Sequence, residues 1–224
     1  MADQALARVA LVAGATGLVG REVLAALLTD RRYSAVHCVG RRPTAVRHPK
    51  LFDHIVDFGA LSTLADIGRV DDVFITLGTT IKTAGSRAAF RAIDFDAVMA
   101  VARAAQRCGA TRLGVVSAMG ADAHSPVFYN RVKGEMEDAL AKLGYQKLVV
   151  ARPSMLDGNR AALAQAARPA EQWGLLAMTL LKPLIPANYR AITAVQVAKA
   201  LVAGVNSADS GLRVLRSGEL QSMG

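Results

Sequence analysis

A tyrosine and a lysine four residues apart, Tyr129 and Lys133, are the pair in this sequence best suited to proton transfer. Side chains at this spacing lie on one face of a helix and can reach the same point. A phenol is a poor acid or base at neutral pH, but a neighbouring ammonium favours its anionic form and lowers its pKa. The sequence therefore predicts that Lys133 activates Tyr129 for proton transfer.

Ser117 stands twelve residues before Tyr129, at the end of the strand-like run GVVSAMG. We expect its hydroxyl to hydrogen-bond a substrate carbonyl while Tyr129 transfers the proton and a hydride moves to or from a nicotinamide. Lys133 would also hydrogen-bond the nicotinamide ribose. Ser117, Tyr129 and Lys133 are thus the predicted catalytic residues. The structural alternative is a helix-face aromatic ring, a solvated lysine and a strand-end hydroxyl.

A glycine-rich loop, GATGLVG over residues 14–20, follows the first strand-like run and precedes a helical pattern. Gly14 would let the strand turn sharply, Gly17 would let the backbone approach a pyrophosphate, and Gly20 would let the helix pack closely on the sheet. The spacing GxxGxxG alone fits a simple glycine-rich turn as well. Its place between a strand and an amphipathic helix favours dinucleotide binding.

The ends of the next strands indicate which dinucleotide is bound. Arg41 and Arg42 close the second strand, where NAD-preferring folds have an acid, and a guanidinium there pairs with a 2′-phosphate. NADP is therefore expected, with a pair of solvated arginines as the alternative.

Asp57 could accept a hydrogen bond from the adenine amino group and Phe58 could flank the ring, unless they form a plain turn. Three residues closing the fourth strand should also lie beside the cofactor: Leu77, Gly78 and Thr79.

The predicted catalytic and cofactor-binding residues must be positioned by a sheet, and the pattern of apolar runs predicts one. Seven short strand-like runs alternate with longer helix-like segments: RVALVAGA, AVHCVG, HIVDF, DDVFITLG, RLGVVSA, KLVVARP and LRVL. This alternation predicts an α/β Rossmann fold, a doubly wound parallel sheet with helices on both faces. We expect one NAD(P)-binding domain over residues 1–224, with a small substrate-side region at about 156–190.

Helix signals complete this outline. Alanine-rich or apolar patterns at helical spacing predict helices over 87–108 and 126–143, the second with Ser125 as its N-cap. A late helix is expected to begin after Thr193. The apolar segment from Trp173 to Leu184 is expected to cover the nicotinamide end of the pocket.

Composition narrows the possible classes. Hydrophobic residues make up 52% of the chain and charged residues 20%, which is enough apolar surface for a sizeable core. The net charge of +9 comes with no basic stripe interleaved with aromatics, so we expect a basic surface with one phosphate pocket and no nucleic-acid binding. The two cysteines and four histidines show no metal-ligand spacing, and no GxSxG sequence surrounds Ser117.

The sequence also gives expectations about cellular location and oligomeric state. The sequence begins with no secretory pattern, so a cytoplasmic location is expected. The apolar run WGLLAMTLL is far shorter than the ~20 residues of a membrane span. We expect a monomer or a homodimer.

Five segments occur in an order that resembles a known family: GATGLVG, LGTT, VVSAMGA, YNRVKGEME and ARPSMLDGNR. The chain resembles the atypical short-chain dehydrogenases/reductases of the Tat-interacting-protein oxidoreductase group. The most specific pieces are LGTTIKTAGSRAAFRAIDFD and YNRVKGEMEDAL. Asp94 stands where epimerase-like relatives often have asparagine, and its charge could alter a proton-relay or structural role. The resemblance implies NADP contacts from Gly14, Thr16, Gly17, Leu18, Val19, Arg41, Arg42, Leu77, Gly78 and Lys133, with Pro153 near the nicotinamide.

The function expected from these observations is an NADP-dependent oxidoreductase that transfers hydride between NADPH and a small carbonyl or alcohol. The alternative is an NADP(H)-sensing interaction protein without significant turnover. A nucleotide-sugar epimerase is less favoured, because those chains usually devote more residues to a substrate lobe than follow Pro153.

Overall fold

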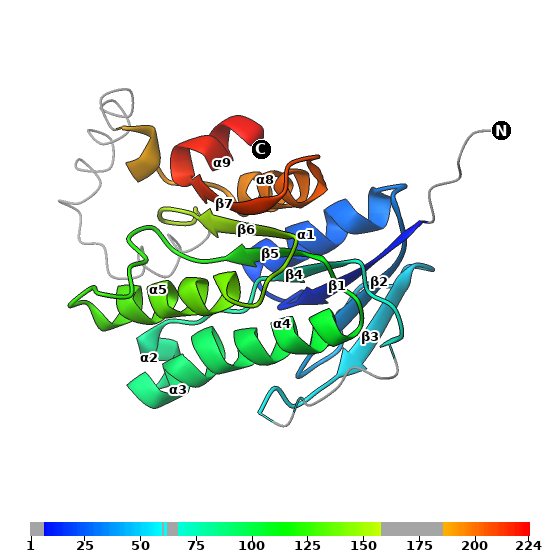
Figure 1. Ribbon diagram of the computed structural model, residues 1–224, viewed down its shortest axis with the longest axis horizontal. Helices are drawn as coiled ribbons and strands as arrows, with labels where there is room; N and C mark the ends of the chain where they lie inside the picture. The colour runs from blue at the N-terminus through cyan, green and yellow to red at the C-terminus, as the bar shows by residue number, and fades with distance from the viewer. Residues whose placement is uncertain (1–6, 60, 62–66, 158–185) are drawn as a thin grey trace, which may run out of the picture.

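Parallel strands in the order β3-β2-β1-β4-β5-β6-β7 form the centre of the molecule (Figure 1). The computed structural model describes residues 7–59, 61, 67–157 and 186–224. The order reverses between β1 and β4, which is the topological switch point of a doubly wound sheet. The strands are β1 (Arg8–Ala13), β2 (Tyr33–Gly40), β3 (Leu51–Ile55), β4 (Asp72–Ile75), β5 (Arg112–Val116), β6 (Lys147–Arg152) and β7 (Gly211–Arg216).

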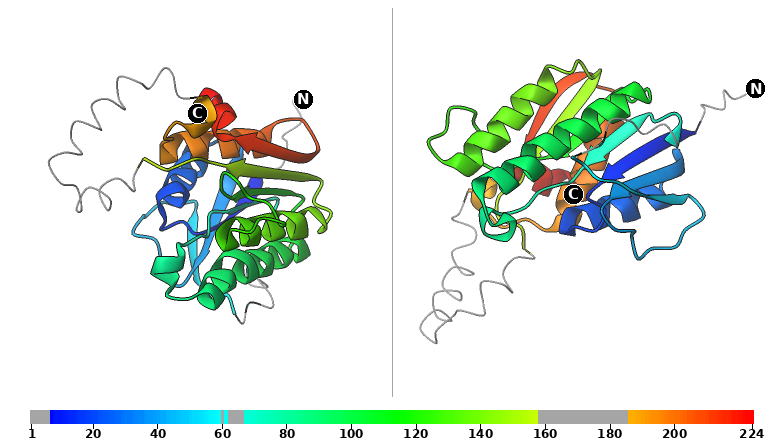
Figure 2. Two further views of the ribbon diagram at one scale, coloured as in Figure 1. Left: turned by 90° about the vertical axis from the view of Figure 1, so that its left-hand side faces the viewer. Right: turned by 90° about the horizontal axis from the view of Figure 1, so that it is seen from below.

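Helices cover both faces of this sheet, as Figures 1 and 2 show. One face carries α1 (Leu18–Thr29), α8 (Ala194–Asn206) and α9 (Ser217–Met223). The other carries α4 (Val98–Arg107) and α5 (Phe128–Ala141). Four short elements complete the set: α2 (Ile81–Ala84), α3 (Arg87–Arg91), the π-helical η2 (Ala92–Ala97) and the 3₁₀ turn η4 (Ala187–Tyr189).

Two hydrophobic cores, one on each face, hold these layers together. Val12, Phe74 and Leu201 are fully buried on the α1/α8 side, and Leu11, Ile75 and Val101 on the α4/α5 side. Strands buried on both faces read as nearly continuous apolar runs, which is why the sequence showed runs rather than strict alternation. The predicted Rossmann fold with helices on both faces is confirmed.

Two predicted element boundaries are wrong. The third strand is Leu51–Ile55, not 54–58, because it pairs with β2 from Val36 onward and ends before Asp57, whose carboxylate accepts the Gly59 N–H in a local turn. Helix α5 begins at Phe128 after an uncapped Val127, and Ser125 instead accepts a hydrogen bond from the Val127 N–H.

Two other helix features bear on the site. Thr193 is the N-cap of α8 as predicted, in a capping box with Gln196. The helix predicted over 87–108 is divided into α3, η2 and α4. The π-helical η2 widens the turn that carries Asp94, and such π-segments are frequent at functional sites.

The turn from β1 to α1 depends on close backbone approach. Gly14 has φ of 90°, a left-handed conformation that side chains rarely adopt. A Cβ on Gly20 would lie 2.0 Å from the Gly14 carbonyl oxygen. These two glycines therefore let α1 start directly above the end of β1.

Part of the predicted substrate side lies outside the described residues. This applies to 158–185, and with them to the predicted cover from Trp173 to Leu184. Among the helices of the described ranges, none has the length and apolar character needed to cross a membrane.

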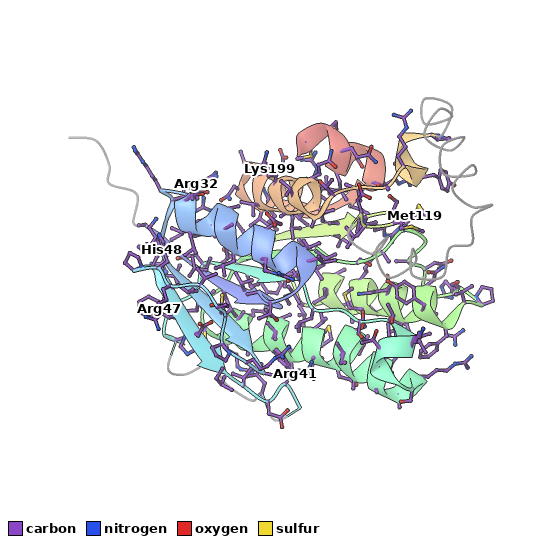
Figure 3. The ribbon with its side chains drawn as sticks, turned by 180° about the vertical axis from the view of Figure 1, so that it is seen from behind. Arg32, Arg41, Arg47, His48, Met119 and Lys199 are labelled. Atoms are coloured by element: carbon purple, nitrogen blue, oxygen red, sulfur yellow. The ribbon has the colours of Figure 1, made fainter. Side chains whose placement is uncertain are left out.

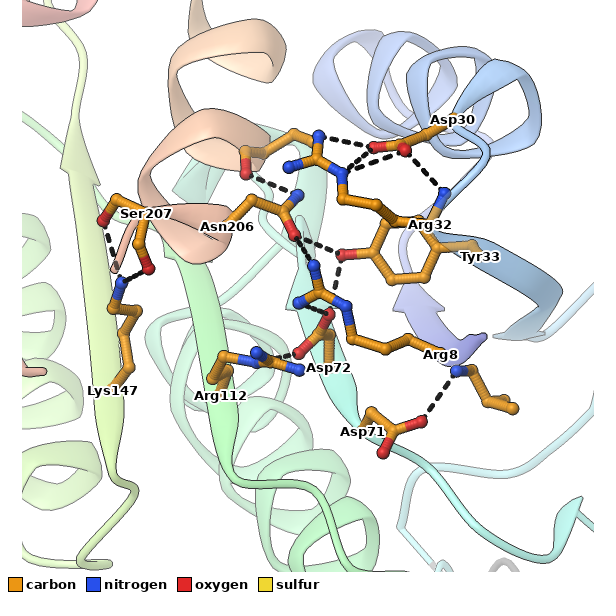
Figure 4. A network of polar contacts seen from close by, with 12 residues as sticks. Arg8, Asp30, Arg32, Tyr33, Asp71, Asp72, Arg112, Lys147, Asn206 and Ser207 are labelled. Carbon is orange, nitrogen blue, oxygen red and sulfur yellow. Dashed lines mark hydrogen bonds and ion pairs between the residues drawn. The ribbon is translucent and has the colours of Figure 1, made fainter. Parts of the chain in front are cut away.

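A buried carboxylate, Asp72, ties the sheet together at the amino ends of its strands (Figure 4). Asp72 is fully buried, forms ion pairs with Arg8 at 3.1 Å and with Arg112, and accepts the Tyr33 hydroxyl at 2.7 Å. Asn206 of α8 joins the same network through Arg8 and Tyr33. One side chain of β4 thus links β1, β2, β5 and α8.

We predict that Asp72→Ala lowers the free energy of unfolding by about 3 kcal/mol, because it leaves two guanidinium groups and a buried hydroxyl without their acceptor. Urea denaturation followed by circular dichroism measures the change. Asp209→Ala is the control, because Asp209 is exposed and its Oδ2 forms a surface ion pair with Arg213 Nη1 at 3.5 Å. Equal stability of Asp72→Ala and wild type would show that the network contributes nothing.

Candidate cofactor and active site

A continuous groove runs along the carboxyl edge of the sheet. Its central part, about 740 Å³, shares Leu77, Gly78 and Thr79 with a cavity of about 470 Å³ on the α5 side, and shares Arg41 and Phe58 with a smaller one on the β2 side. An elongated groove at a topological switch point is the usual place for a dinucleotide. The predicted cofactor residues all line it: Gly14, Thr16, Gly17, Leu18, Val19, Arg41, Arg42, Asp57, Phe58, Leu77, Gly78, Thr79, Lys133 and Pro153.

The start of α1 faces the middle of the groove. Gly17 is the N-cap of this helix and supplies no side-chain hydrogen bond to the first turn. The N–H groups of that turn are therefore left for a ligand, and the helix dipole favours an anion there. Gly17 N–H itself donates to the Gly14 carbonyl at 2.9 Å, which fixes the loop.

The β2 end of the groove carries both the predicted arginines and an acid that sequence reasoning missed. Arg41 and Arg42 line the small cavity, and Asp53 of β3 lines it too. Thr44 donates its hydroxyl to Asp53 at 2.9 Å. Asp53 faces this cavity because it pairs with Cys38 across the β2–β3 ladder. The sequence prediction placed the third strand at 54–58, so Asp53 lay outside it. Figure 3 labels Arg41 at this end.

Ser117, Tyr129 and Lys133 line the same α5-side cavity, so the structure brings the three predicted catalytic residues together. Their partners differ from those expected. The Lys133 ammonium lies 2.7 Å from Asp94 Oδ1, with both side chains buried. Apart from this ion pair, Oδ1 has no polar partner among the described residues. The other oxygen, Oδ2, accepts the Thr79 N–H at 2.9 Å.

The expected lowering of the Tyr129 pKa is contradicted. Burial and, second, the Asp94 carboxylate raise the pKa of Tyr129 to about 12. The ring packs on Phe90 with centroids 5.3 Å apart, which accounts for much of that burial. Burial also raises the pKa of Asp94, against the effects of Lys133 and the Thr79 N–H. Tyr129 is therefore a neutral phenol, and the charge of Lys133 is balanced by Asp94.

Ser117 belongs to a second buried network. Its hydroxyl donates to Glu137 of α5, and Arg152 of β6 donates to the same carboxylate through Nε at 3.1 Å and Nη2 at 2.5 Å. Sequence reasoning named neither Glu137 nor Arg152. Glu137 follows Lys133 by four residues on the same helix face, a signal that could have identified it.

A bound metal ion would need several ligand side chains close together. Within the ranges that the structure describes, no group of three or more histidine, cysteine or acidic side chains is placed to hold an ion.

Comparison with known proteins assigns the family. A family model described as NAD(P)H-binding matches residues 14–169. A mitochondrial protein of Coccidioides immitis (strain RS), FMP52, is 33% identical over 162 residues, covering 66% of each chain. The protein fmp52 of Emericella nidulans is 31% identical over 173 residues, 74% of this chain and 72% of the relative. The chain belongs to the NAD(P)H-binding family.

A solved structure agrees with this assignment. An oxidoreductase of the short-chain dehydrogenase/reductase family from Burkholderia thailandensis superposes with a TM-score of 0.69 at 19% identity, over 95% of this chain and 92% of that one. At this identity the likeness concerns the fold. Together with the family model, it confirms the resemblance to short-chain dehydrogenases/reductases inferred from the motifs.

The expected cytoplasmic location is contradicted by these comparisons. Both FMP52 relatives are named as mitochondrial proteins. The expectation rested on the lack of a recognisable secretory pattern, and such a lack does not distinguish one compartment from another.

We predict that Asp94→Asn lowers the pH at which Tyr129 ionises, because it removes the negative charge that disfavours tyrosinate. Tyrosinate absorbance, measured against Tyr129→Phe in each background, isolates this residue from Tyr33, Tyr145 and Tyr189. Asp96→Asn is the matched control, since Asp96 is exposed on the same η2 segment. An unchanged or higher transition in Asp94→Asn would rule out the electrostatic role of Asp94.

Proposed function

We propose that this protein is an NADP-dependent oxidoreductase that transfers hydride between NADPH and a small carbonyl or alcohol. One observation carries the proposal: Ser117, Tyr129 and Lys133 line a cavity that continues into the groove formed by the glycine-rich loop. A substrate in this cavity would therefore meet a proton donor beside the nicotinamide end of the cofactor. Membership of the NAD(P)H-binding family supports the cofactor class.

The preference for NADP rests on Arg41 and Arg42. Two guanidinium groups beside the β2 end of the groove can bind a 2′-phosphate through charge-assisted hydrogen bonds. Asp53 lines the same cavity and accepts the Thr44 hydroxyl, and no ion pair joins it to either arginine among the described contacts. The arginine charges thus exceed the acidic charge at this end.

Tyr129 is proposed as the proton donor. When bound, the reduced nicotinamide supplies the hydride. The neutral phenol of Tyr129 then gives its proton to the carbonyl oxygen as negative charge develops there. Lys133 has three N–H donors, so facing Asp94 leaves donors for the ribose hydroxyl groups of the cofactor.

Ser117 needs a small rearrangement for its proposed role. Its proton points to Glu137, so the oxygen offers only lone pairs to the cavity. Rotation about its side-chain bond would turn that proton toward a substrate carbonyl. Glu137 keeps its hydrogen bonds from Arg152 after this rotation. Its carboxylate is therefore not left without a donor, which lowers the free-energy cost of losing the hydrogen bond from Ser117.

The second candidate is an NADP(H) sensor without significant turnover. The observation that favours it is the engagement of both Ser117 and Lys133 by buried carboxylates. In a sensor these networks would serve to hold α5 and η2 against the cofactor groove.

We predict that replacing Arg41 and Arg42 by glutamine weakens NADPH binding at least about tenfold, since charge-assisted hydrogen bonds contribute ~1.5–3 kcal/mol each. NADH binding should hardly change, because NADH carries no 2′-phosphate. Calorimetric titration of both cofactors measures the difference. Arg47→Gln is the control: Arg47 is exposed and lines none of the three cavities of the groove. An equal loss for NADPH and NADH would contradict the assignment of these arginines.

We predict that Tyr129→Phe lowers the turnover of any reduced carbonyl by at least about a hundredfold, because general acid catalysis contributes ~10²–10⁴-fold. NADPH binding should persist, since the ring and its packing on Phe90 are kept. Lys133→Met should weaken both turnover and NADPH affinity. The measurement is NADPH oxidation at 340 nm across a carbonyl panel, with Tyr145→Phe as the control, because the Tyr145 hydroxyl donates to the Ala102 carbonyl and lines none of the described cavities.

The two candidate functions give different results in this experiment. A sensor would turn over no carbonyl in wild-type form, and Tyr129→Phe would then leave its cofactor binding intact. Substantial reductase activity in Tyr129→Phe would refute the proposed mechanism even with the fold and cofactor unchanged.

A further inference from the structure

A separate cavity of about 240 Å³ lies beside the proposed active site, toward η4 and α9. Its lining includes Met119, Arg152, Asn188, Tyr189, Arg216 and Ser217. Figure 3 labels Met119 far from Arg41, so this cavity lies away from the adenosine end of the groove.

Three links join this cavity to the active-site cavity. Met119 lies two residues after Ser117, and Arg152 immediately precedes Pro153. Ser217 donates its hydroxyl to Ser154 at 2.9 Å, and Ser154 lines the active-site cavity. The two cavities are therefore neighbours at the ends of β5 and β6.

Among the described residues, those that line the cavity include several hydrogen-bond donors and no acid. Arg152 donates to Glu137 through Nε and Nη2, and its Nη1 makes no hydrogen bond to a side chain or backbone group of the described residues. Asn188 Oδ1 accepts the Gly218 N–H at 2.9 Å, which leaves the amide nitrogen of Asn188 as a donor.

Arg216 supplies the uncompensated charge. No carboxylate forms an ion pair with its guanidinium in the described ranges, and Glu219 of α9 instead accepts the Arg216 backbone N–H at 2.9 Å. Arg152 is balanced by Glu137, so the positive charge of the cavity comes mainly from Arg216. Hydrogen-bond donors around a positive charge that no lining carboxylate neutralises suit an anion.

We propose that this cavity binds a carboxylate or phosphate group at the far end of the carbonyl substrate. The inference rests on the proposed function, to which it adds the substrate class: small carbonyl compounds with an anionic end. Arg216 makes the principal contact, and Arg152 offers its free Nη1 edge. Because Arg152 also holds Glu137, the partner of Ser117, the anion site and the serine hydroxyl share one network.

The first test measures anion binding without turnover. Protein saturated with NADP⁺ is titrated with inorganic phosphate by calorimetry, so that the cofactor groove is filled. Arg216→Gln should weaken phosphate binding about tenfold or more, the effect of losing one charge-assisted contact. Arg213→Gln is the matched control on the same strand, since Arg213 does not line the cavity. Equal phosphate binding by wild type and Arg216→Gln overturns the proposal.

The second test identifies the source of the anion. In wild type, 4-carboxybenzaldehyde should displace phosphate, and its methyl ester should not. If phosphate binds through Arg216 but the carboxylate aldehyde does not compete, the cavity takes a free anion and the substrate assignment is overturned. If competition is observed but the protein loaded with NADPH instead reduces no aldehyde, the anion site stands and the proposed reductase function fails.

Discussion

The buried ammonium of Lys133 determines much of the arrangement at the carboxyl edge of the sheet. A charge removed from water needs a close counter-charge and hydrogen bonds, because its desolvation costs several kcal/mol. Asp94 meets this need at 2.7 Å, and the Thr79 N–H satisfies the second carboxylate oxygen. One ion pair thereby fixes α5, the π-helical η2 and the loop after β4 around a single point. That point lies under Gly78, where a Cβ would come within 3.4 Å of Asp94 Oδ1.

The same rule explains the second network of the site. Glu137 is buried, and its carboxylate accepts hydrogen bonds from Arg152 on β6 and from the hydroxyl of Ser117 after β5. Two carboxylates thus hold two of the three proposed catalytic groups, Ser117 and Lys133, each from a different structural element. A polar group held in this way keeps one orientation, which is the preorganisation that proton and hydride transfer require.

The sequence contained most of the fold and the composition of the site. Continuous apolar runs located the strands, the glycine spacing located the turn above β1, and helical spacing placed Tyr129 and Lys133 on one face. These signals are local, so a single stretch of chain contains them. The partner of Lys133 is not local: Asp94 comes from a segment 39 residues earlier, and only the packing of η2 on α5 brings it near.

The misplaced third strand has a similar explanation. Phe52 and His54 of β3 are not fully covered, so the strand lacks the apolar run that marks the central strands. Its bounds come from pairing with β2, which no local pattern records. The acid at Asp53 was overlooked for the same reason, since its position opposite Cys38 follows from that register.

The ionisation of Tyr129 bears on the direction of the proposed reaction. Reduction of a carbonyl needs a phenol that still carries its proton, whereas oxidation of an alcohol needs a tyrosinate to accept one. With burial and Asp94 holding the pKa of Tyr129 at about 12, the protonated form dominates at neutral pH and the tyrosinate is scarce. On the proposed function, the acidic residue at position 94 therefore makes this site a better proton donor than acceptor, and suits it to carbonyl reduction. An asparagine there would reduce that bias while keeping a hydrogen-bonding group beside Lys133, and burial, the larger cause of the raised pKa, would remain.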